Sequence, residues 1–232
     1  MKRNDDRLFH DGFTMSTQVP FQSGVTLAGA GPFDAEDLRA ARVLAPHVVA
    51  ADGGADRLAG FGAVPEYIIG DMDSLDGEAP EGTRVLAVPE QDSTDFGKCL
   101  ARVTAPVIVG IGFLGGRLDH TLAALSVLLQ YADRRVVLLG EEDIAFVAPP
   151  GWAVTVEVGA RVSFFPLVPC RGMSSTGLRW PIEGLEMRAG GQIGTSNEAV
   201  DARISASFAP PGAVTILPKR YLGAVVESLG GS

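Results

Sequence analysis

Cysteine is scarce in this sequence, and long apolar runs are missing. The only two cysteines, Cys99 and Cys170, have no metal-ligand spacing and suggest no disulfide scaffold, so both are expected to be reduced and structural. No apolar run approaches the ~20 residues of a membrane-spanning helix. The polar first residues also lack the apolar centre of a signal peptide. These absences predict a cytoplasmic protein that does not bind a membrane.

Positive charge is also in short supply. The 19 Lys and Arg residues are outnumbered by 28 Asp and Glu residues, which gives a formal net charge of −9. This excess argues against nucleic acids and membrane surfaces as partners, although local cations or a metal could still attract a nucleotide. Hydrophobic residues make up 46% of the 232 residues, enough for a sizeable core in one large or two modest domains.

Short apolar runs alternate with helical patterns in the first 148 residues. This alternation predicts a mainly parallel sheet covered by helices on both faces, with ligands at the carboxyl ends of the strands. Helices are expected over 32–45, with Pro32 in the first turn, over 93–103, with a capping hydroxyl, and over 119–133. The expected strands are 25–29, 47–52, 66–71, 84–90, 106–112 and 135–141.

The pattern changes near Pro150. Glycine and proline then punctuate strand-like segments, and no convincing helix follows, so a small antiparallel β-sandwich is predicted. We therefore expect a disordered extension over 1–20, an α/β domain over 21–149 and a β-sandwich domain over 150–232. The strand-like segments are 153–159, 161–168, 184–189, 202–209 and 213–218.

Acidic residues follow four of the expected strands. Since the carboxyl ends of parallel strands share one edge of a sheet, about six acids should converge on one cleft. The carboxylates of Asp71 and Asp73 are only one residue apart and repel each other, so they either turn toward water or hold a cation. Mg²⁺ prefers such oxygen ligands, and Asp71, Asp73 and Asp95 are the predicted ones. The residues at these strand ends are Asp52, Asp71, Asp73, Asp92, Asp95, Gly115, Gly116, Arg117 and Asp119.

Two cations accompany the acids. Lys98 lies one turn after Asp95 on the same face of its helix and could reach a phosphate beside the metal. Arg117 follows two glycines, which let the backbone approach a ligand closely. Helix starts near Ser93 and Asp119 offer N–H groups to phosphates. Acids, a metal and two cations suit phosphoryl-type transfer, in which positioning and charge neutralisation supply most of the catalysis.

Each of these residues also has a structural interpretation. Asp52 could be an ordinary turn residue, and aspartates after strands often cap turns. Asp95 could stabilise a helix N-terminus with Lys98 as its surface partner, and His120 could face solvent at a helix start. The recurrence of polar residues at four consecutive strand ends favours a functional site. The chain lacks a complete P-loop, dinucleotide glycine loop and nucleophile elbow.

Six blocks of sequence, in order, closely resemble the signatures of the thiamine pyrophosphokinase family. They are ADGGADRL, IIGDMDSL, QDSTDFGKCL, GGRLDHTLAAL, GLRWPI and GTSNE, within a resemblance over residues 22–220. The resemblance implies an α/β domain followed by a β-sandwich, and a homodimer with active sites between unlike domains of its two subunits. It also implies Mg²⁺-dependent transfer of the pyrophosphoryl group of ATP to thiamine. The rival interpretations are a non-catalytic nucleotide- or thiamine-binding module and a magnesium-dependent nucleotide hydrolase.

The resemblance also distributes roles among the residues. Asp71, Asp73, Asp95 and Lys98 form the predicted catalytic set, and the three acids are the predicted metal ligands. Trp180 either stacks on thiamine or is a core residue of the β-domain, and Ser196 and Asn197 match a loop of that domain. The predicted ATP-binding residues are Asp52, Gln91, Asp92, Thr94, Lys98, Gly115, Gly116 and Arg117, and the predicted thiamine-binding residues are Asp119, Trp180, Ser196 and Asn197.

Overall fold

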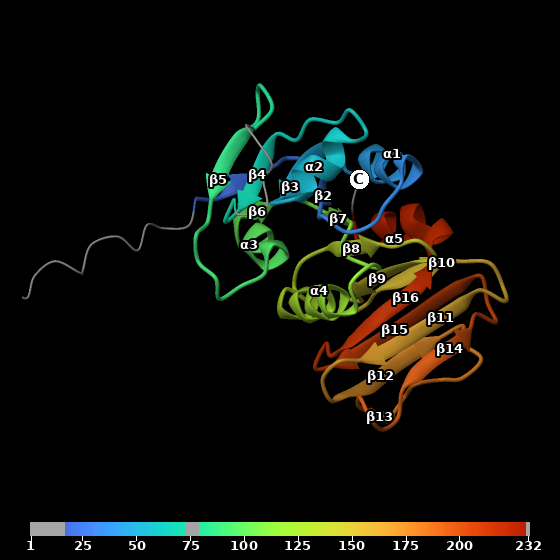
Figure 1. Cartoon of the computed structure of the whole chain (residues 1–232). Helices are drawn as coiled ribbons and strands as arrows, with labels where there is room; N and C mark the ends of the chain where they lie inside the picture. The colour runs from blue at the N-terminus through green and yellow to red at the C-terminus, as the bar shows by residue number, and fades with distance from the viewer. Residues whose placement is uncertain (1–16, 73–78, 231–232) are drawn as a thin grey trace, which may run out of the picture.

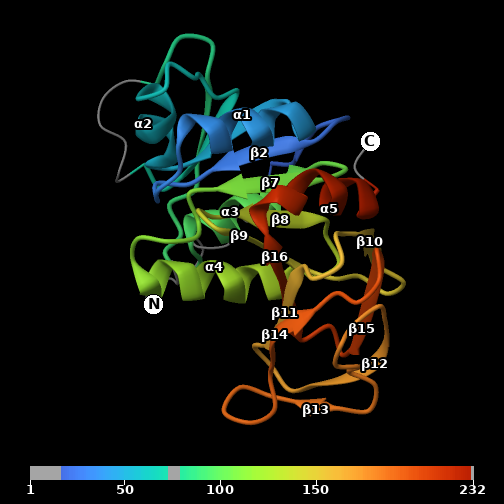
Figure 2. The same cartoon turned by 90° about the vertical axis from the view of Figure 1, so that its right-hand side faces the viewer.

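The computed structural model describes residues 17–72 and 79–230, so the predicted metal ligand Asp73 lies outside the described residues (Figures 1 and 2). All six strands expected in the first half are present. Near-continuous apolar runs identify most of them because both faces of such strands are buried, whereas the strand Arg84–Ala87 is largely exposed. The six strands are β2 (Val25–Ala28), β3 (His47–Ala51), β4 (Tyr67–Gly70), β5 (Arg84–Ala87), β7 (Ile108–Ile111) and β8 (Val136–Leu139).

These strands form the mainly parallel sheet that the alternation predicts. Strands β3, β4 and β5 pair in parallel, and so do β2, β7 and β8. A bridge between Val25 and Pro46 places β3 beside β2. The chain therefore adds strands on one side of β2 as far as β5 and then returns to its other side with β7. Such a reversal of direction opens a crevice at the carboxyl ends of the strands, which is where ligands bind in open α/β sheets.

Helices cover both faces of this sheet, so the predicted three-layer α/β class is confirmed. Alternate side chains of β7 pack against the helices on opposite faces of the sheet: Val109 and Ile111 on one face, and Ile108 on the other. The first side carries α1 (Ala35–Leu44), α2 (Gly54–Ala59) and α5 (Leu222–Ser228), and the second carries α3 (Asp95–Arg102) and α4 (Leu118–Gln130).

The helices differ from the predictions in their boundaries and in number. Asp34, rather than Pro32, begins the first helix, because its carboxylate accepts hydrogen bonds from the backbone N–H groups of Glu36 and Asp37. The short helix α2, which begins at the second glycine of the Gly53–Gly54 pair, was not predicted. In the second half, α5 corrects the prediction that no helix would follow residue 150.

The second half forms the predicted antiparallel β-sandwich, but one of its layers belongs to the main sheet. Strand β9 was not predicted; it pairs with β8 on one side and with β16 on the other. The sheet thus runs without a break through β9 (Asp143–Val147), β16 (Ala213–Pro218), β11 (Arg161–Pro166) and β14 (Gly194–Glu198). The facing layer contains β10 (Ala153–Thr155), β15 (Arg203–Ala209), β12 (Cys170–Thr176) and β13 (Glu186–Met187).

A small additional sheet lies at the described start of the chain. Strand β1 (Val19–Pro20) pairs in parallel with β6 (Val103–Thr104), and Val19 is buried. Residues 19–20 therefore form a strand rather than part of a disordered extension, while residues 1–16 lie outside the described residues. The predicted limits of the two domains stay a prediction. Among the described residues, no helix is long and apolar enough to cross a membrane.

Candidate active site

Asp52 directly follows β3 and lies in the short turn between β3 and α2. Its φ of +42° lies in the left-handed region, which aspartate tolerates better than most residues. The residue is 2% exposed, and its Oδ1 atom has no hydrogen-bond partner among the described residues. Gly70, at the end of β4, makes this position possible, because a Cβ there would lie only 2.6 Å from the Asp52 Cβ. A buried carboxylate oxygen without a partner carries a desolvation cost that a cation would remove.

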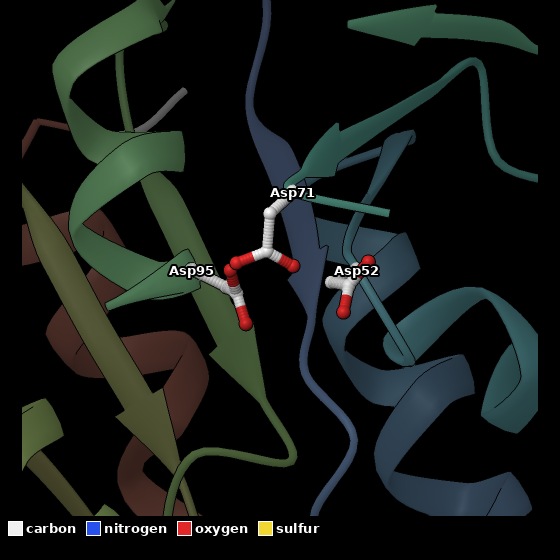
Figure 3. Close-up of side chains that lie close together, drawn as sticks. All are labelled: Asp52, Asp71 and Asp95. Carbon is white, nitrogen blue, oxygen red and sulfur yellow. The ribbon is translucent and has the colours of Figure 1, made fainter. Parts of the chain in front are cut away.

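Three carboxylates meet at this point. Asp71 directly follows β4, and Asp95 is the first residue of α3. Each offers a carboxylate oxygen, as does Asp52, and these three atoms all lie within 4.8 Å of one another. Figure 3 shows the three side chains pointing toward a common space. The sequence predicted the convergence of acids, but it assigned Asp52 to ATP rather than to the acid triad, which we define as Asp52, Asp71 and Asp95.

Lys98 lies against the triad. Its Nζ atom donates hydrogen bonds to Asp71 Oδ2 at 2.7 Å and to Asp95 Oδ1 at 3.1 Å. Gln91 Nε2 donates to the same Asp71 oxygen at 3.2 Å. Lys98 is only 2% exposed, so the alternative in which it is a surface partner of Asp95 is wrong. The ammonium is held in place by its two carboxylate partners, because a buried ammonium without them would be a costly unpaired charge.

The electrostatic setting distinguishes the members of this cluster. Burial raises the pKa of Asp95, and the charges of Asp52 and Asp71 raise it further, which outweighs the opposite effect of Lys98. Burial lowers the pKa of Lys98, but its hydrogen bonds to Asp71 and Asp95 more than offset this, so the pKa lies above its usual value. Lys98 therefore stays protonated, and the triad with its lysine carries a net negative charge.

Several backbone N–H groups at the start of α3 already have hydrogen-bond partners, although they were expected to be free. The backbone N–H groups of Asp92 and Ser93 donate to Glu90 Oε2 at 2.9 and 3.1 Å. The side-chain hydrogen bond from Ser93, together with these backbone bonds, lowers the pKa of Glu90. Thr94 caps the helix through its Oγ1 atom, which accepts from Gly97 N. The prediction that the N–H groups near Ser93 are free for phosphates is therefore wrong for Ser93 itself.

Glycines bring the ends of β2 and β7 close together beside the triad. A Cβ at Gly29 would lie 2.7 Å from the carbonyl oxygen of Gly112, and one at Gly31 would lie 2.6 Å from it. Sequence reasoning noted the stretch around Gly29 only as an incomplete dinucleotide loop. Gly115 and Gly116 then both take positive φ values, +81° and +65°. This glycine-rich edge leaves backbone, rather than side chains, facing the crevice.

Arg117 and Asp119 form an ion pair at the start of α4. The guanidinium donates to both carboxylate oxygens, at 2.6 Å from Nη2 and 3.1 Å from Nε. Both side chains are largely exposed. The hydrogen bonds from Arg117 lower the pKa of Asp119. The structure thus joins a predicted ATP residue to a predicted thiamine residue, a pair that was not predicted.

Two family models match the chain: the catalytic domain of thiamin pyrophosphokinase over residues 42–139, and its vitamin B1 binding domain over residues 154–209. A thiamin pyrophosphokinase of Caenorhabditis elegans is 31% identical over 180 residues, which cover 69% of this chain and 74% of that protein. The chain belongs to the thiamine pyrophosphokinase family.

Further comparisons agree with membership of the thiamine pyrophosphokinase family. Thiamine pyrophosphokinase 2 of Arabidopsis thaliana is 32% identical, over 57% of this chain and 58% of that protein. The chain thus spans less than two thirds of the Arabidopsis relatives that it matches. The crystal structure of thiamin pyrophosphokinase from Geobacillus thermodenitrificans superposes with a TM-score of 0.67 at 26% identity, over 84% of this chain and 96% of that one.

The B1-binding model of the thiamine pyrophosphokinase family spans the remaining predicted residues. Trp180 is 55% exposed, so the alternative of a core residue is wrong. Asn197 is buried and holds the Trp180 backbone from both sides: its Oδ1 accepts from Trp180 N at 3.2 Å, and its Nδ2 donates to Trp180 O at 2.7 Å. Ser196, with a φ of +59°, donates its N–H to Ser163 Oγ at 3.0 Å. Ser196 and Asn197 lie on β14 rather than on a loop.

Proposed function

We propose that this protein transfers the pyrophosphoryl group of ATP to the hydroxyl of thiamine, giving thiamine diphosphate and AMP. The observation that carries the proposal is the acid triad with the buried Lys98, at the carboxyl edge of the sheet, in a chain of the thiamine pyrophosphokinase family. In the reaction, a bond forms between the thiamine oxygen and the β-phosphorus. The bond from that phosphorus to the oxygen of the α-phosphate breaks, AMP leaves, and the hydroxyl proton is released.

The donor set fits a magnesium ion. Three carboxylates with oxygens within 4.8 Å of one another supply the hard oxygen ligands that this ion prefers, and one buried oxygen of Asp52 has no hydrogen-bond partner within residues 17–72 and 79–230. We propose that Asp52, Asp71 and Asp95 hold the ion together with Asp73, which lies outside the described residues. A bound Mg²⁺ would neutralise phosphate charge and leave its remaining positions to phosphate oxygens and water.

The chain's own cations and polar groups would orient the nucleotide. Arg117 is exposed and could exchange its bond to Asp119 for one to a phosphate, and the glycine-rich backbone around Gly115 and Gly116 could approach the phosphates closely. Gln91, Asp92 and Thr94 shortly precede Asp95 in the sequence, and they stay proposed ATP contacts. Positioning of this kind supplies most of the catalysis in phosphoryl-type transfer.

The thiamine side of the site would come from the β-sandwich. The exposed indole of Trp180 offers a flat aromatic face for a cationic thiazolium or a pyrimidine ring. We propose that a homodimer brings this side to the triad of its partner subunit, and that the protein works in the cytoplasm. Exposed apolar side chains one turn apart on α4, Leu118 at 71% and Leu122 at 54%, support a protein interface beside the entrance to the site.

A chromatographic assay tests the activity. Purified protein is incubated with ATP, Mg²⁺ and thiamine, and the nucleotide and thiamine products are identified. AMP with thiamine diphosphate, both lost without Mg²⁺, is the expected result. ADP with thiamine monophosphate would contradict transfer of an intact pyrophosphoryl group. Loss of ATP without thiamine would indicate a nucleotide hydrolase instead, and binding without turnover would indicate a non-catalytic binding module.

A further inference from the structure

Lys98 is an unusual neighbour for a metal site. It is one of three lysines in the chain, at positions 2, 98 and 219, and its side chain is 1% exposed. Its ammonium contacts two of the three triad carboxylates, at 2.7 and 3.1 Å. Asp71 and Asp95 are thus already neutralised in part, while Asp52 Oδ1 has no described partner. The lysine therefore lies where it affects any cation that these carboxylates hold.

We propose that Lys98 is a built-in counter-ion that competes with the metal for Asp71 and Asp95, so that metal and nucleotide bind cooperatively. This inference rests on the proposed function, because it takes the triad as the metal site and a nucleoside triphosphate as the second ligand. A divalent cation arriving alone meets a fixed positive charge at two of its three ligands. A cation arriving with phosphates brings acceptors to which the ammonium can transfer its hydrogen bonds.

The charges of the cluster explain why an ammonium group lies among the three carboxylates. Three carboxylates and one ammonium leave a formal charge of −2 in a place where Asp52 and Lys98 are buried and Asp71 and Asp95 are partly exposed. Without the lysine, the three acids would repel one another with no ammonium among them to offset the repulsion. Lys98 therefore keeps the acids together before any ligand binds. The same attraction weakens the hold of the acids on a metal ion, since both cations are attracted to the same oxygens.

Binding of Mn²⁺ alone, followed by electron paramagnetic resonance at pH 8, tests the competition. Lys98→Met is expected to bind Mn²⁺ about tenfold or more tightly than the wild type, because one repelling charge is removed next to the site. Lys219→Met is the matched control. It also removes a lysine paired with an aspartate, but that aspartate is Asp37 at the start of α1. Its Mn²⁺ affinity should equal that of the wild type.

Equal or weaker Mn²⁺ binding by a folded Lys98→Met variant would overturn the inference, because the lysine would then only support the site. A wild-type measurement covers the case in which this variant does not fold. With three lysines, ¹⁵N-lysine labelling gives a simple ammonium spectrum, in which a buried, hydrogen-bonded Lys98 should be protected from exchange with water.

Addition of Mg²⁺ with α,β-methylene-ATP is expected to shift the Lys98 signal at a Mg²⁺ concentration that leaves it unchanged without the nucleotide. An equal shift with Mg²⁺ alone would contradict the cooperativity. Neither measurement uses thiamine or turnover. A protein that shows the expected Mn²⁺ and NMR results but forms no thiamine diphosphate would refute the proposed function and leave the role of Lys98 standing.

Discussion

Gly70 gives Asp52 the space that its side chain occupies: a Cβ built on Gly70 would lie 2.6 Å from the Asp52 Cβ and 3.1 Å from its Oδ1. The two residues come from neighbouring strands, β4 and β3, which pair in parallel up to this point. The position of one carboxylate of the acid triad therefore depends on the absence of a side chain in the next strand. A single methyl group there tests whether Asp52 belongs to the site.

Gly70→Ala is expected to displace Asp52, weaken Mn²⁺ binding and lower the free energy of unfolding by about 1–3 kcal/mol through overpacking. Calorimetry and Mn²⁺ titration measure the two effects. Gly223→Ala is the control, because a Cβ at that helical position meets nothing within 4 Å. It should leave Mn²⁺ binding unchanged and make the helix slightly more stable. Normal Mn²⁺ affinity in Gly70→Ala would remove Asp52 from the set of ligands.

Asp71→Asn keeps the shape of the side chain and an oxygen for Lys98, but removes the charge that a metal ligand needs. Turnover of ATP and thiamine should fall by about a hundredfold or more, with the fold intact by circular dichroism. Asp56→Asn, on the exposed face of α2, should have near-normal turnover. If Asp71→Asn kept near-normal activity with the same dependence on Mg²⁺, the triad would not be the metal site.

Asp95 should make the ligand-free protein less stable at neutral pH. Its pKa is raised in the fold by burial, so its ionised form costs stability above that pKa, and the cost disappears as the pH falls through it. Asp95→Asn is therefore expected to melt above the wild type at pH 7.5, and the difference should shrink toward about pH 4.

The control for Asp95→Asn has the opposite sign. Arg117 lowers the pKa of Asp119, so Asp119→Asn should lose stability at pH 7.5, and that loss should fade as the pH falls. Melting temperatures over the pH series measure both variants. An Asp95→Asn protein that melts below the wild type at pH 7.5 would show that its pairing with Lys98 outweighs the burial of its charge.

Trp180 and Asn197 should respond differently to truncation. Trp180→Ala removes an exposed ring, so the KM for thiamine should rise about three- to tenfold without a change in melting temperature. Asn197→Ala leaves the backbone N–H of Trp180 without its partner and should also lower the free energy of unfolding by about 1–3 kcal/mol. Unchanged thiamine kinetics in Trp180→Ala would remove the indole from the site.

A homodimer with shared sites should allow two impaired variants to complement each other when thiamine is kept well below its KM, where the Trp180→Ala defect limits turnover. Asp71→Asn damages the metal side and Trp180→Ala the thiamine side, so a mixed dimer would contain one site with both sides intact. After unfolding and refolding the two variants together, about one quarter of the sites should be intact, given random pairing in a two-fold dimer. Turnover no greater than the sum of the separate variants would contradict a site built by two subunits.

Much of this architecture could be predicted because buried parallel strands have near-continuous apolar sequences. Asp52, Asp71 and Asp95 could be brought together in the prediction because the ends of parallel strands share an edge. The structure adds what periodicity does not encode. Glu90 occupies N–H groups at the start of α3, Arg117 binds Asp119, and Asn197 supports a backbone rather than facing open space. Such contacts depend on side-chain rotamers and on neighbours distant in sequence.

The union of both halves through β9 and β16 has a mechanical consequence. Five residue pairs, from Val214 with Val147 to Pro218 with Asp143, join the sandwich layer to the strands beside the crevice. A hinge between the halves would have to bend or break these hydrogen bonds, which secondary structure resists. We therefore expect the two halves to move as one body, and the substrates of the proposed reaction to enter by rearrangement of side chains and loops around the sheet.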